Sequence, residues 1–473
     1  MVIMSIKINN AETKMMYKVC LIVDNPIRDL EGITLIAWHL AKKNIICYIV
    51  PMYCQAFDVI SLKPDLVLVN YLRPNNVNLL LRYKKENIKI CILDTEGSPG
   101  KDLSKYASFI DKIKEKNLVD IYCLWGEEQY KSFKEKKLFN DNIVKITGCP
   151  RYDFCVYPYN QTLPKIFRKK RFILINTTFP VGNPKFTRDF KIEEKAMVDM
   201  GYDKVFAKNY AKDSFNANRK LVNILSKICQ SFPNFDFVLR PHPFESSMPY
   251  KKLLKNKNFQ ICQTQTAIEW LNCCEALIHL NCQTAIESVM MNKEPISIEW
   301  INTPHLKAEG PPGNLSHNAN NFEELSNYIN NIINNKKLKP RKQMINERNH
   351  LIKSRLFNND GFSSLRVSKV INEFLLSNKT SLTLDHKNKF NHKQVAREVL
   401  GFKIFHWIRR VIQGQKAEFR RNEKNFTLKE VELIIKRLNK IDSNKITVKA
   451  NKVLKNDLSI PKMFSHKTIK IFI

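Results

Sequence analysis

Glycine is scarce in this chain, with 12 residues in 473, so a glycine-rich phosphate loop is not expected to dominate any site. Metal-binding patterns are missing as well. The 12 cysteines lie between Cys20 and Cys282 without a Cys-x-x-Cys pair, and no His, Cys and Asp residues have zinc-like spacing. We therefore predict no metal and no cofactor. Most cysteines sit in apolar runs, which favours buried thiols in a reducing compartment over disulfides.

Long apolar segments are also lacking. Residues 1–14 are polar, without the hydrophobic region of a secretory signal, and no apolar run approaches the roughly 20 residues that span a bilayer. We predict a cytoplasmic protein that can lie peripherally on the inner face of the cytoplasmic membrane.

Positive charge is abundant, with a formal net charge of +33. Such an excess favours polyanionic partners: nucleic acid, anionic lipid or phosphorylated substrates. Nucleic acid is the weaker expectation, because no helix-turn-helix, RNP-like or zinc motif is present.

Short apolar runs alternate with helical patterns over two stretches of the chain, which predicts parallel sheets covered on both faces. The fold class is α/β, with two Rossmann-like domains facing across a cleft and a basic, mainly helical C-terminal tail. A polar, mobile insertion is expected up to about Asp213, with a helix over residues 217–229. The predicted parts are a disordered N-terminus (1–16), an N-terminal acceptor domain (17–150), a linker (151–170), a donor-binding domain (171–376) and the tail (377–473).

The tail from Lys379 onward carries 23 Lys and Arg against 8 Asp and Glu, an excess of 15. Apolar residues from Val395 to Ile412 alternate with basic ones around Trp407, the pattern of an amphipathic helix at a membrane surface. The alternative interpretation is that the tail helices pack on the rest of the protein.

An apolar strand pattern ends at Arg240-Pro-His-Pro-Phe-Glu245. Two prolines cannot donate backbone hydrogen bonds, so the strand stops there and leaves Arg240 and His242 at its carboxyl end. Ligands of open α/β sheets bind at that edge, and both side chains suit a phosphate. The alternative is a turn in which they only satisfy backbone groups.

Two further strand ends carry polar residues. Asp94-Thr-Glu-Gly97 offers Asp94 or Glu96 as a general base, with Gly97 permitting a tight turn or close approach of a substrate. Asn281-Cys-Gln-Thr-Ala-Ile-Glu287 opens a helix at which Gln283 and Thr284 could bind phosphate and Glu287 a ribose hydroxyl. Helix capping is the alternative interpretation of each stretch, although three strand ends with polar residues are less easily dismissed than any one of them.

Taken with the turn Gly148-Cys-Pro-Arg-Tyr-Asp153 and with Asn292-Lys-Glu-Pro295, these motifs resemble bacterial surface carbohydrate biosynthesis proteins, which look like GT-B glycosyltransferases. The Arg-Pro-His-Pro element is similar to that of CDP-glycerol glycerophosphotransferases. The order of motifs resembles sialyltransferases and Kdo transferases. The resemblance covers residues 17 to 375. It departs at Cys149, where relatives tend to have Asn, and at Asn281 and Gln283, where Ser or Thr is common.

The resemblance implies a metal-independent transferase of surface polysaccharide assembly. It would move a sugar from a nucleotide-activated donor, favoured as CMP- or CDP-linked, to a glycan or lipid-linked acceptor. Asp94 or Glu96 would be the base, while Arg240, His242, Gln283 and Thr284 would hold the donor phosphate. Glu287 would bind the ribose, and Gly97, Gly148, Asn281 and Glu245 would support the turns. The alternatives are a CDP-linked polyol-phosphate transferase, a nucleotide-sugar epimerase and a basic nucleic-acid-binding protein.

Overall fold

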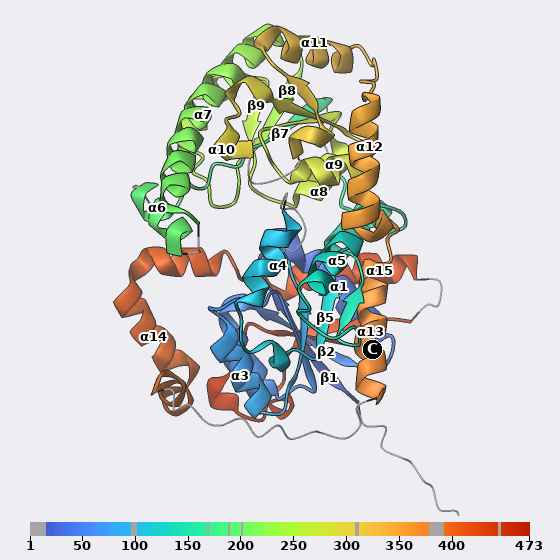
Figure 1. Ribbon diagram of the computed structural model, residues 1–473, viewed down its shortest axis with the longest axis vertical. Coiled ribbons are helices and arrows are strands. Elements are labelled where there is room, and N and C mark those ends of the chain that lie inside the picture. Colours follow the sequence, from blue (N-terminus) through green and yellow to red (C-terminus); the bar gives the residue numbers. More distant parts are fainter. Residues whose placement is uncertain are drawn as a thin grey trace, which may run out of the picture.

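Two sheets, one for each half of the chain, organise the protein (Figure 1). The computed structural model describes residues 16–95, 102–166, 168, 170–187, 190–199, 202–307, 312–377, 392–442 and 446–473. The predicted disordered N-terminus lies, except for Met16, outside these residues.

The N-terminal sheet has the strand order β13-β14-β2-β1-β3-β4-β5-β6. Its first six strands in the sequence are mutually parallel: β1 (Lys18–Val23), β2 (Ile46–Pro51), β3 (Leu66–Val69), β4 (Lys89–Leu93), β5 (Ile121–Leu124) and β6 (Val144–Ile146). These strands are continuous apolar runs, as expected where both faces are covered. The covering helices are α1 (Pro26–Ala41), α2 (Gln55–Leu62), α3 (Val77–Lys85), α4 (Leu103–Asp111) and α5 (Glu127–Glu135).

The second sheet is wholly parallel, with the order β12-β11-β10-β7-β8-β9. Its strands are β7 (Phe172–Asn176), β8 (Asp236–Arg240), β9 (Phe259–Ile261), β10 (Ala276–His279), β11 (Glu294–Ile298) and β12 (His317–Ala319). Renumbered from β7, this order is 3-2-1-4-5-6, the doubly wound Rossmann order, and the direction of winding reverses between β7 and β10. The predicted fold class is therefore confirmed.

The helices of the second half are α6 (Phe190–Asp199), α7 (Lys204–Ser231), α8 (Ala267–Cys273), α9 (Thr284–Met290), α10 (Pro304–Lys307), α11 (Phe322–Ile333) and α12 (Lys342–His350). The next helix, α13 (Ser363–Ser377), packs on the first half. The helix predicted over residues 217–229 begins earlier, at Lys204, so α6 and the first turns of α7 lie in the stretch predicted as a polar, mobile insertion. One face of α7 is buried there through Ala207, Tyr210, Ala211 and Ser214, and all of these except Tyr210 are small residues that carry little hydrophobic signal in the sequence.

The tail is built into the N-terminal half. It forms α14 (His392–Asn422) and α15 (Leu428–Ile441), and then the strands β13 (Lys449–Lys452) and β14 (Ile469–Phe472). β14 pairs antiparallel with the edge strand β2, and β13 pairs with β14. Besides the predicted helices, the tail thus adds two strands to the first sheet.

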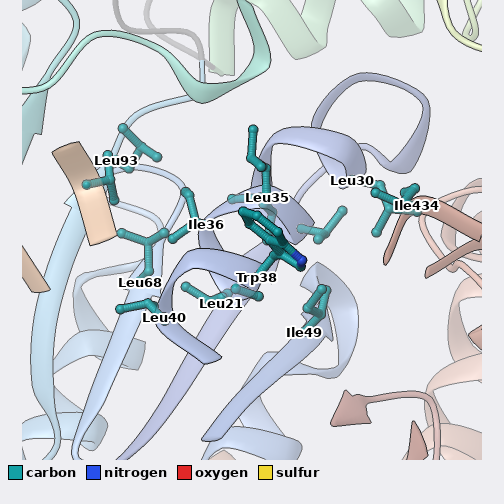
Figure 2. Close-up of a cluster of buried hydrophobic side chains, with 14 of the residues drawn as sticks. Leu21, Leu30, Leu35, Ile36, Trp38, Leu40, Ile49, Leu68, Leu93 and Ile434 are labelled. Atoms are coloured by element: carbon teal, nitrogen blue, oxygen red, sulfur yellow. The ribbon is translucent and has the colours of Figure 1, made fainter. Parts of the chain in front are cut away.

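The packing of α1 explains why the tail folds there. Its buried side chains form one cluster with the sheet, with α13 and with α15, and Figure 2 shows Ile434 of α15 among them. Trp38 of α1 donates its indole N–H to Asn439 Oδ1 of α15 at 2.9 Å. The interpretation of the tail helices as packed elements therefore holds for α15.

Candidate functional site

A cavity of about 580 Å³ is lined by residues of both halves. The second half contributes the residues that follow the carboxyl ends of β7, β8 and β10, where the winding of its sheet reverses. The first half contributes the start of α1, Thr95 after β4, and Arg151. This is where ligands bind in open α/β sheets, and the volume lies within the usual range for small-molecule sites.

Six of the residues predicted from the sequence line this cavity together: Arg240, His242, Asn281, Gln283, Thr284 and Glu287. They are separated by up to 47 positions in the chain and come from two strand ends, so the parallel sheet brings them together. Their proximity is a property of the fold, whereas their roles stay predictions.

Arg240 and His242 follow β8, whose ladder ends at Asn176↔Arg240. Arg240 donates from Nη2 to the backbone oxygen of Gln265 at 2.6 Å, and burial lowers the pKa of its guanidinium. The backbone N–H of Phe244 donates to His242 Nδ1 at 3.2 Å. Because Nδ1 accepts, the neutral imidazole carries its hydrogen on Nε2, which makes the ring a donor there.

The loop after β10 is shaped by Asn281, which has a φ of +51°, a left-handed conformation that asparagine tolerates better than most residues. Its side chain donates to Asn302 Oδ1 at 2.5 Å. Thr284 Oγ1 accepts from Asn176 Nδ2 at 3.0 Å and donates to Cys282 Sγ at 3.1 Å. The helix that follows, α9, is seven residues long, so its dipole adds less to anion binding than a long helix would.

Glu287 is 7% exposed and faces several cations. Burial raises the pKa of its carboxyl, while Arg151, Arg240 and Arg28 act in the opposite direction. Its Oε1 lies 3.7 Å from Arg151 Nε, too far for a hydrogen bond. Such a loosely paired carboxylate can accept hydrogen bonds from ligand hydroxyls.

Several buried polar atoms around the cavity have no hydrogen-bond partner within the described part of the chain. They are Asn176 Oδ1, Arg151 Nε, Arg240 Nε, Gln283 Oε1, Glu287 Oε2 and Thr95 Oγ1. Buried polar groups are normally paired, so a cluster of six at one cavity indicates a site for a polar ligand. The cations Arg28, Arg151 and Arg240 face the acids Glu31 and Glu287 here, and this balance favours an anionic ligand.

The Asp94 turn is placed differently. Asp94 is 1% exposed and accepts a hydrogen bond from the hydroxyl of Tyr106, which lies 3.0 Å from that of Tyr122. It does not line the cavity, whereas the next residue, Thr95, does. Glu96 and Gly97 lie outside the described residues.

Glu245 and Gly148 do not line the cavity either. Glu245 is fully buried and accepts hydrogen bonds from Thr177, Asn183, Asn218, Tyr250 and the backbone of Phe179. It therefore fixes the turn that follows Arg240 and His242.

Gly148 has a φ of +80°, and a Cβ there would lie 2.4 Å from Ser363 Oγ. In the same turn, Asp153 accepts the backbone N–H groups of Ser363 and Ser364 at 3.0 and 2.7 Å. The turn thus joins the first half to α13.

Sequence reasoning missed Arg28 and Glu31 of α1, and also Arg151, as residues that line the cavity. Arg28 donates to Asp24 and Asp29, and Glu31 accepts from Arg437 Nη2 at 2.7 Å. A Cβ on Gly32 would lie 2.8 Å from the backbone nitrogen of Arg151, so a glycine lets Arg151 approach α1. The available signal was Asp24-Asn25-Pro26, another polar turn directly after a buried strand.

His279 was predicted to be structural, and it is buried with Nε2 2.8 Å from Ser316 Oγ. Burial lowers the pKa of its imidazole to about 3, so it is neutral at ordinary pH. Within the part of the chain that the structure describes, no group of His, Cys, Asp and Glu could hold a metal ion.

Together, two facing Rossmann-like halves and a shared cationic cavity define a GT-B-like architecture. No family model and no curated protein matches the chain. The chain is similar in structure to a UDP-GlcNAc 2-epimerase from Methanocaldococcus jannaschii solved with UDP-GlcNAc and UDP. Identity is 13%, the TM-score is 0.44, and the match covers 76% of this chain and 100% of that one.

The S. aureus protein MnaA, solved with UDP, gives 12% identity, a TM-score of 0.45, and coverage of 80% of this chain and 100% of that one. A variant of the wall teichoic acid polymerase TagF gives 14% identity, a TM-score of 0.44, and coverage of 68% and 74%. At TM-scores below 0.5 these likenesses carry no weight for function, and the fold class rests on the two sheets of this chain.

Proposed function

We propose that the chain is a GT-B-type transferase of bacterial surface polysaccharide assembly that uses a nucleotide-activated donor, with CMP- or CDP-linked donors favoured. The observation that carries the proposal is the cavity between the halves, where Arg240, His242 and Arg151 meet a cluster of unpaired buried polar atoms. Guanidinium groups bind phosphate bidentately, and the sequence motifs at these strand ends resemble those of cytidylyl-donor enzymes.

In this reaction the acceptor hydroxyl attacks the anomeric carbon of the donor, and the bond from that carbon to the phosphate oxygen breaks. The electron pair leaves with the nucleotide phosphate. Arg240 and His242 stabilise the charge that develops on it, in a site where preorganised donors act strongly. Arg28 and Arg151 add positive charge from the first half.

The hydroxyl proton goes to a carboxylate of the first half. The burial of Asp94 against Tyr106 supports Glu96 over Asp94 as that base, with Asp94 in a positioning role. Glu31 is a second candidate, because it lines the cavity. Once a donor substrate is identified, Glu96→Gln and Glu31→Gln distinguish the two candidate bases. The variant that lacks the base should lose turnover and keep nucleotide binding, and the other variant should keep both.

The test of the proposal is thermal unfolding of the protein against CMP, CDP, UDP, GDP and ADP. A ligand at 100 times its dissociation constant stabilises the fold by roughly 2.7 kcal/mol. We expect a shift with CMP or CDP that is lost in His242→Ala. A shift with UDP or GDP alone would retain a nucleotide-dependent enzyme and discard the cytidylyl donor. No shift with any nucleotide would contradict the proposal and favour a basic nucleic-acid-binding protein.

A nucleotide-sugar epimerase would share this architecture, and a CDP-linked polyol-phosphate transferase would share this chemistry. Release of a free hexosamine from a nucleotide sugar without an acceptor would favour the epimerase. Transfer of a polyol phosphate, with attack at phosphorus, would favour the second alternative.

We further propose that α14 brings the enzyme to anionic lipid and to lipid-linked acceptors. Its Phe402 and Phe405 pack on Phe57 of the first half, whereas Ile404, Trp407 and Val411 are 49%, 64% and 65% exposed. Lys403 and Arg410 are exposed on the same helix. An aromatic anchor with basic neighbours suits an anionic interface. Among the described residues, no helix is long and apolar enough to cross a bilayer.

Vesicle co-sedimentation tests the role of α14. We expect the protein to bind phosphatidylglycerol vesicles. Trp407→Ala should weaken this binding, and Leu433→Ser, at an exposed position of α15, should leave it unchanged. Equal sedimentation of Trp407→Ala and the unmodified protein would refute it.

A further inference from the structure

The short turn between α14 and α15 reaches the candidate nucleotide site from the tail. Lys424 in this turn is 8% exposed. Its Nζ donates to Asp24 Oδ1 at 2.8 Å and lies 5.5 Å from the centre of the Phe244 ring. A buried ammonium group needs such compensation. Lys424 thus touches one residue from each half of the protein.

On the side of the first half, Asp24 follows β1 and uses its second oxygen to accept from Arg28 Nη2 at 2.9 Å. Arg28 lines the cavity. Lys424 and Arg28 therefore share the carboxylate of Asp24. Asp29 also accepts from Arg28, with 2.8 Å between Nε and Oδ1 and 3.0 Å between Nη2 and Oδ2.

On the side of the second half, Phe244 donates its backbone N–H to His242 Nδ1. Glu423, which precedes Lys424 in the turn, pairs with Lys185 at 2.5 Å. The backbone N–H of Lys185 in turn donates to the backbone oxygen of Phe244 at 3.0 Å. The turn therefore contacts the segment that orients the imidazole of His242.

We propose that Lys424 is a positioning residue of the nucleotide site, setting Arg28 through Asp24 and His242 through Phe244. The assignment rests on the proposed function, because it concerns the same phosphate-binding residues. It makes the tail a component of that site in addition to its part in the sheet. Without the lysine, Asp24 would hold Arg28 more tightly, which leaves less of the guanidinium for a phosphate.

The experiment compares Lys424→Met with Lys429→Met in the full chain. Methionine keeps an unbranched side chain of similar length against Phe244 and removes the ammonium group, with its charge and its hydrogen bond to Asp24. Lys429 is exposed on α15, which makes it the matched control. Calorimetric titration measures the dissociation constant for whichever of CMP, CDP, UDP, GDP or ADP the unmodified protein binds. Hydrogen exchange of the ligand-free protein measures the protection of residues 240–246.

We expect Lys424→Met to weaken nucleotide binding on the order of tenfold or more, as loss of an outer-shell partner often does, and to speed exchange over residues 240–246. Lys429→Met should change neither. Unchanged affinity in Lys424→Met would overturn the assignment while the proposed function stands. If no nucleotide binds the unmodified protein, the proposed function fails. In that case hydrogen exchange alone tests the positioning role of Lys424, and unchanged exchange over residues 240–246 in Lys424→Met overturns it.

If Lys424→Met does not fold, Glu423→Gln provides the second variant. It removes the negative charge that pairs with Lys185 at a partly exposed position and leaves Lys424 in place. Weaker nucleotide binding and faster exchange over residues 240–246 would support the role of the turn, and an unchanged result in both would overturn it.

Discussion

Replacing Glu245 is predicted to destabilise the second half of the protein strongly. The carboxylate is fully buried and accepts from Thr177 Oγ1 at 2.7 Å, Phe179 N at 3.1 Å and Tyr250 Oη at 2.5 Å. Two further donors, Asn183 Nδ2 and Asn218 Nδ2, are each at 3.4 Å. In Glu245→Ala all five donors lose this acceptor.

The magnitude follows from the three short bonds. A hydrogen bond to a charged group contributes about 1.5–3 kcal/mol, and leaving a buried donor unpaired costs about 1–3 kcal/mol. Burial raises the pKa of the Glu245 carboxyl, so the native protein already bears a desolvation cost that alanine removes. The net expectation is a loss of about 3–5 kcal/mol.

Urea unfolding at neutral pH measures this loss. Glu275→Ala is the control, because Glu275 forms a half-exposed ion pair with Arg171 at 3.0 Å, and such pairs are worth less than about 1 kcal/mol. A loss in Glu245→Ala no larger than that of the control would refute the reasoning. Nucleotide binding should also weaken in the folded variant, because Glu245 holds the turn that carries Arg240 and His242.

Three more perturbations test other parts of the structure. Asp58 accepts from Ser465 and Thr468 of the tail, and burial raises the pKa of its carboxyl to about 6. It therefore contributes stability at low pH that is lost as pH rises through 6. Relative to the unmodified protein, Asp58→Asn should therefore become more stable by about 2 kcal/mol between pH 4 and pH 7 in urea unfolding. Parallel pH profiles would contradict this. A chain ending at Ser377 should not fold, because α1 and the edge of β2 lose their cover, and a circular dichroism melt of unchanged midpoint would contradict that. Gly32→Val should displace Arg151 and weaken nucleotide binding at least about tenfold, measured by calorimetry, and unchanged affinity would argue against it.

The sequence predicted the elements whose signal is local. Continuous apolar strands such as residues 19–23 and 172–175 stand out in the sequence. Six residues in the polar turns that follow β8 and β10 were among the predicted site residues, and all six line the cavity. The order of the sheets then brought the turns after β8 and β10 together, as the rule for open α/β sheets anticipates.

The features that could not be predicted from the sequence depend on contacts between distant segments. β14 pairs with β2 across more than 400 positions, and its short, polar-interrupted pattern gives no hint of this partner. The pairs Arg437–Glu31 and Lys424–Asp24 are equally remote, so charged residues of the tail look like solvated surface in the sequence. The position of Asp94 at a strand end did not predict the direction of its side chain, because its carboxylate faces Tyr106 while its neighbour Thr95 lines the cavity.

The central claim is that the cavity between the halves binds the phosphates of a nucleotide. Calorimetric titration of nucleosides against their mono- and diphosphates tests this claim most directly. We predict that at least one of these nucleotides binds, that its nucleoside binds at least about a hundredfold more weakly, and that Arg240→Ala removes most of the difference. Binding of a nucleoside as tight as that of its phosphorylated form, or no binding of any mono- or diphosphate by the folded protein, would contradict it.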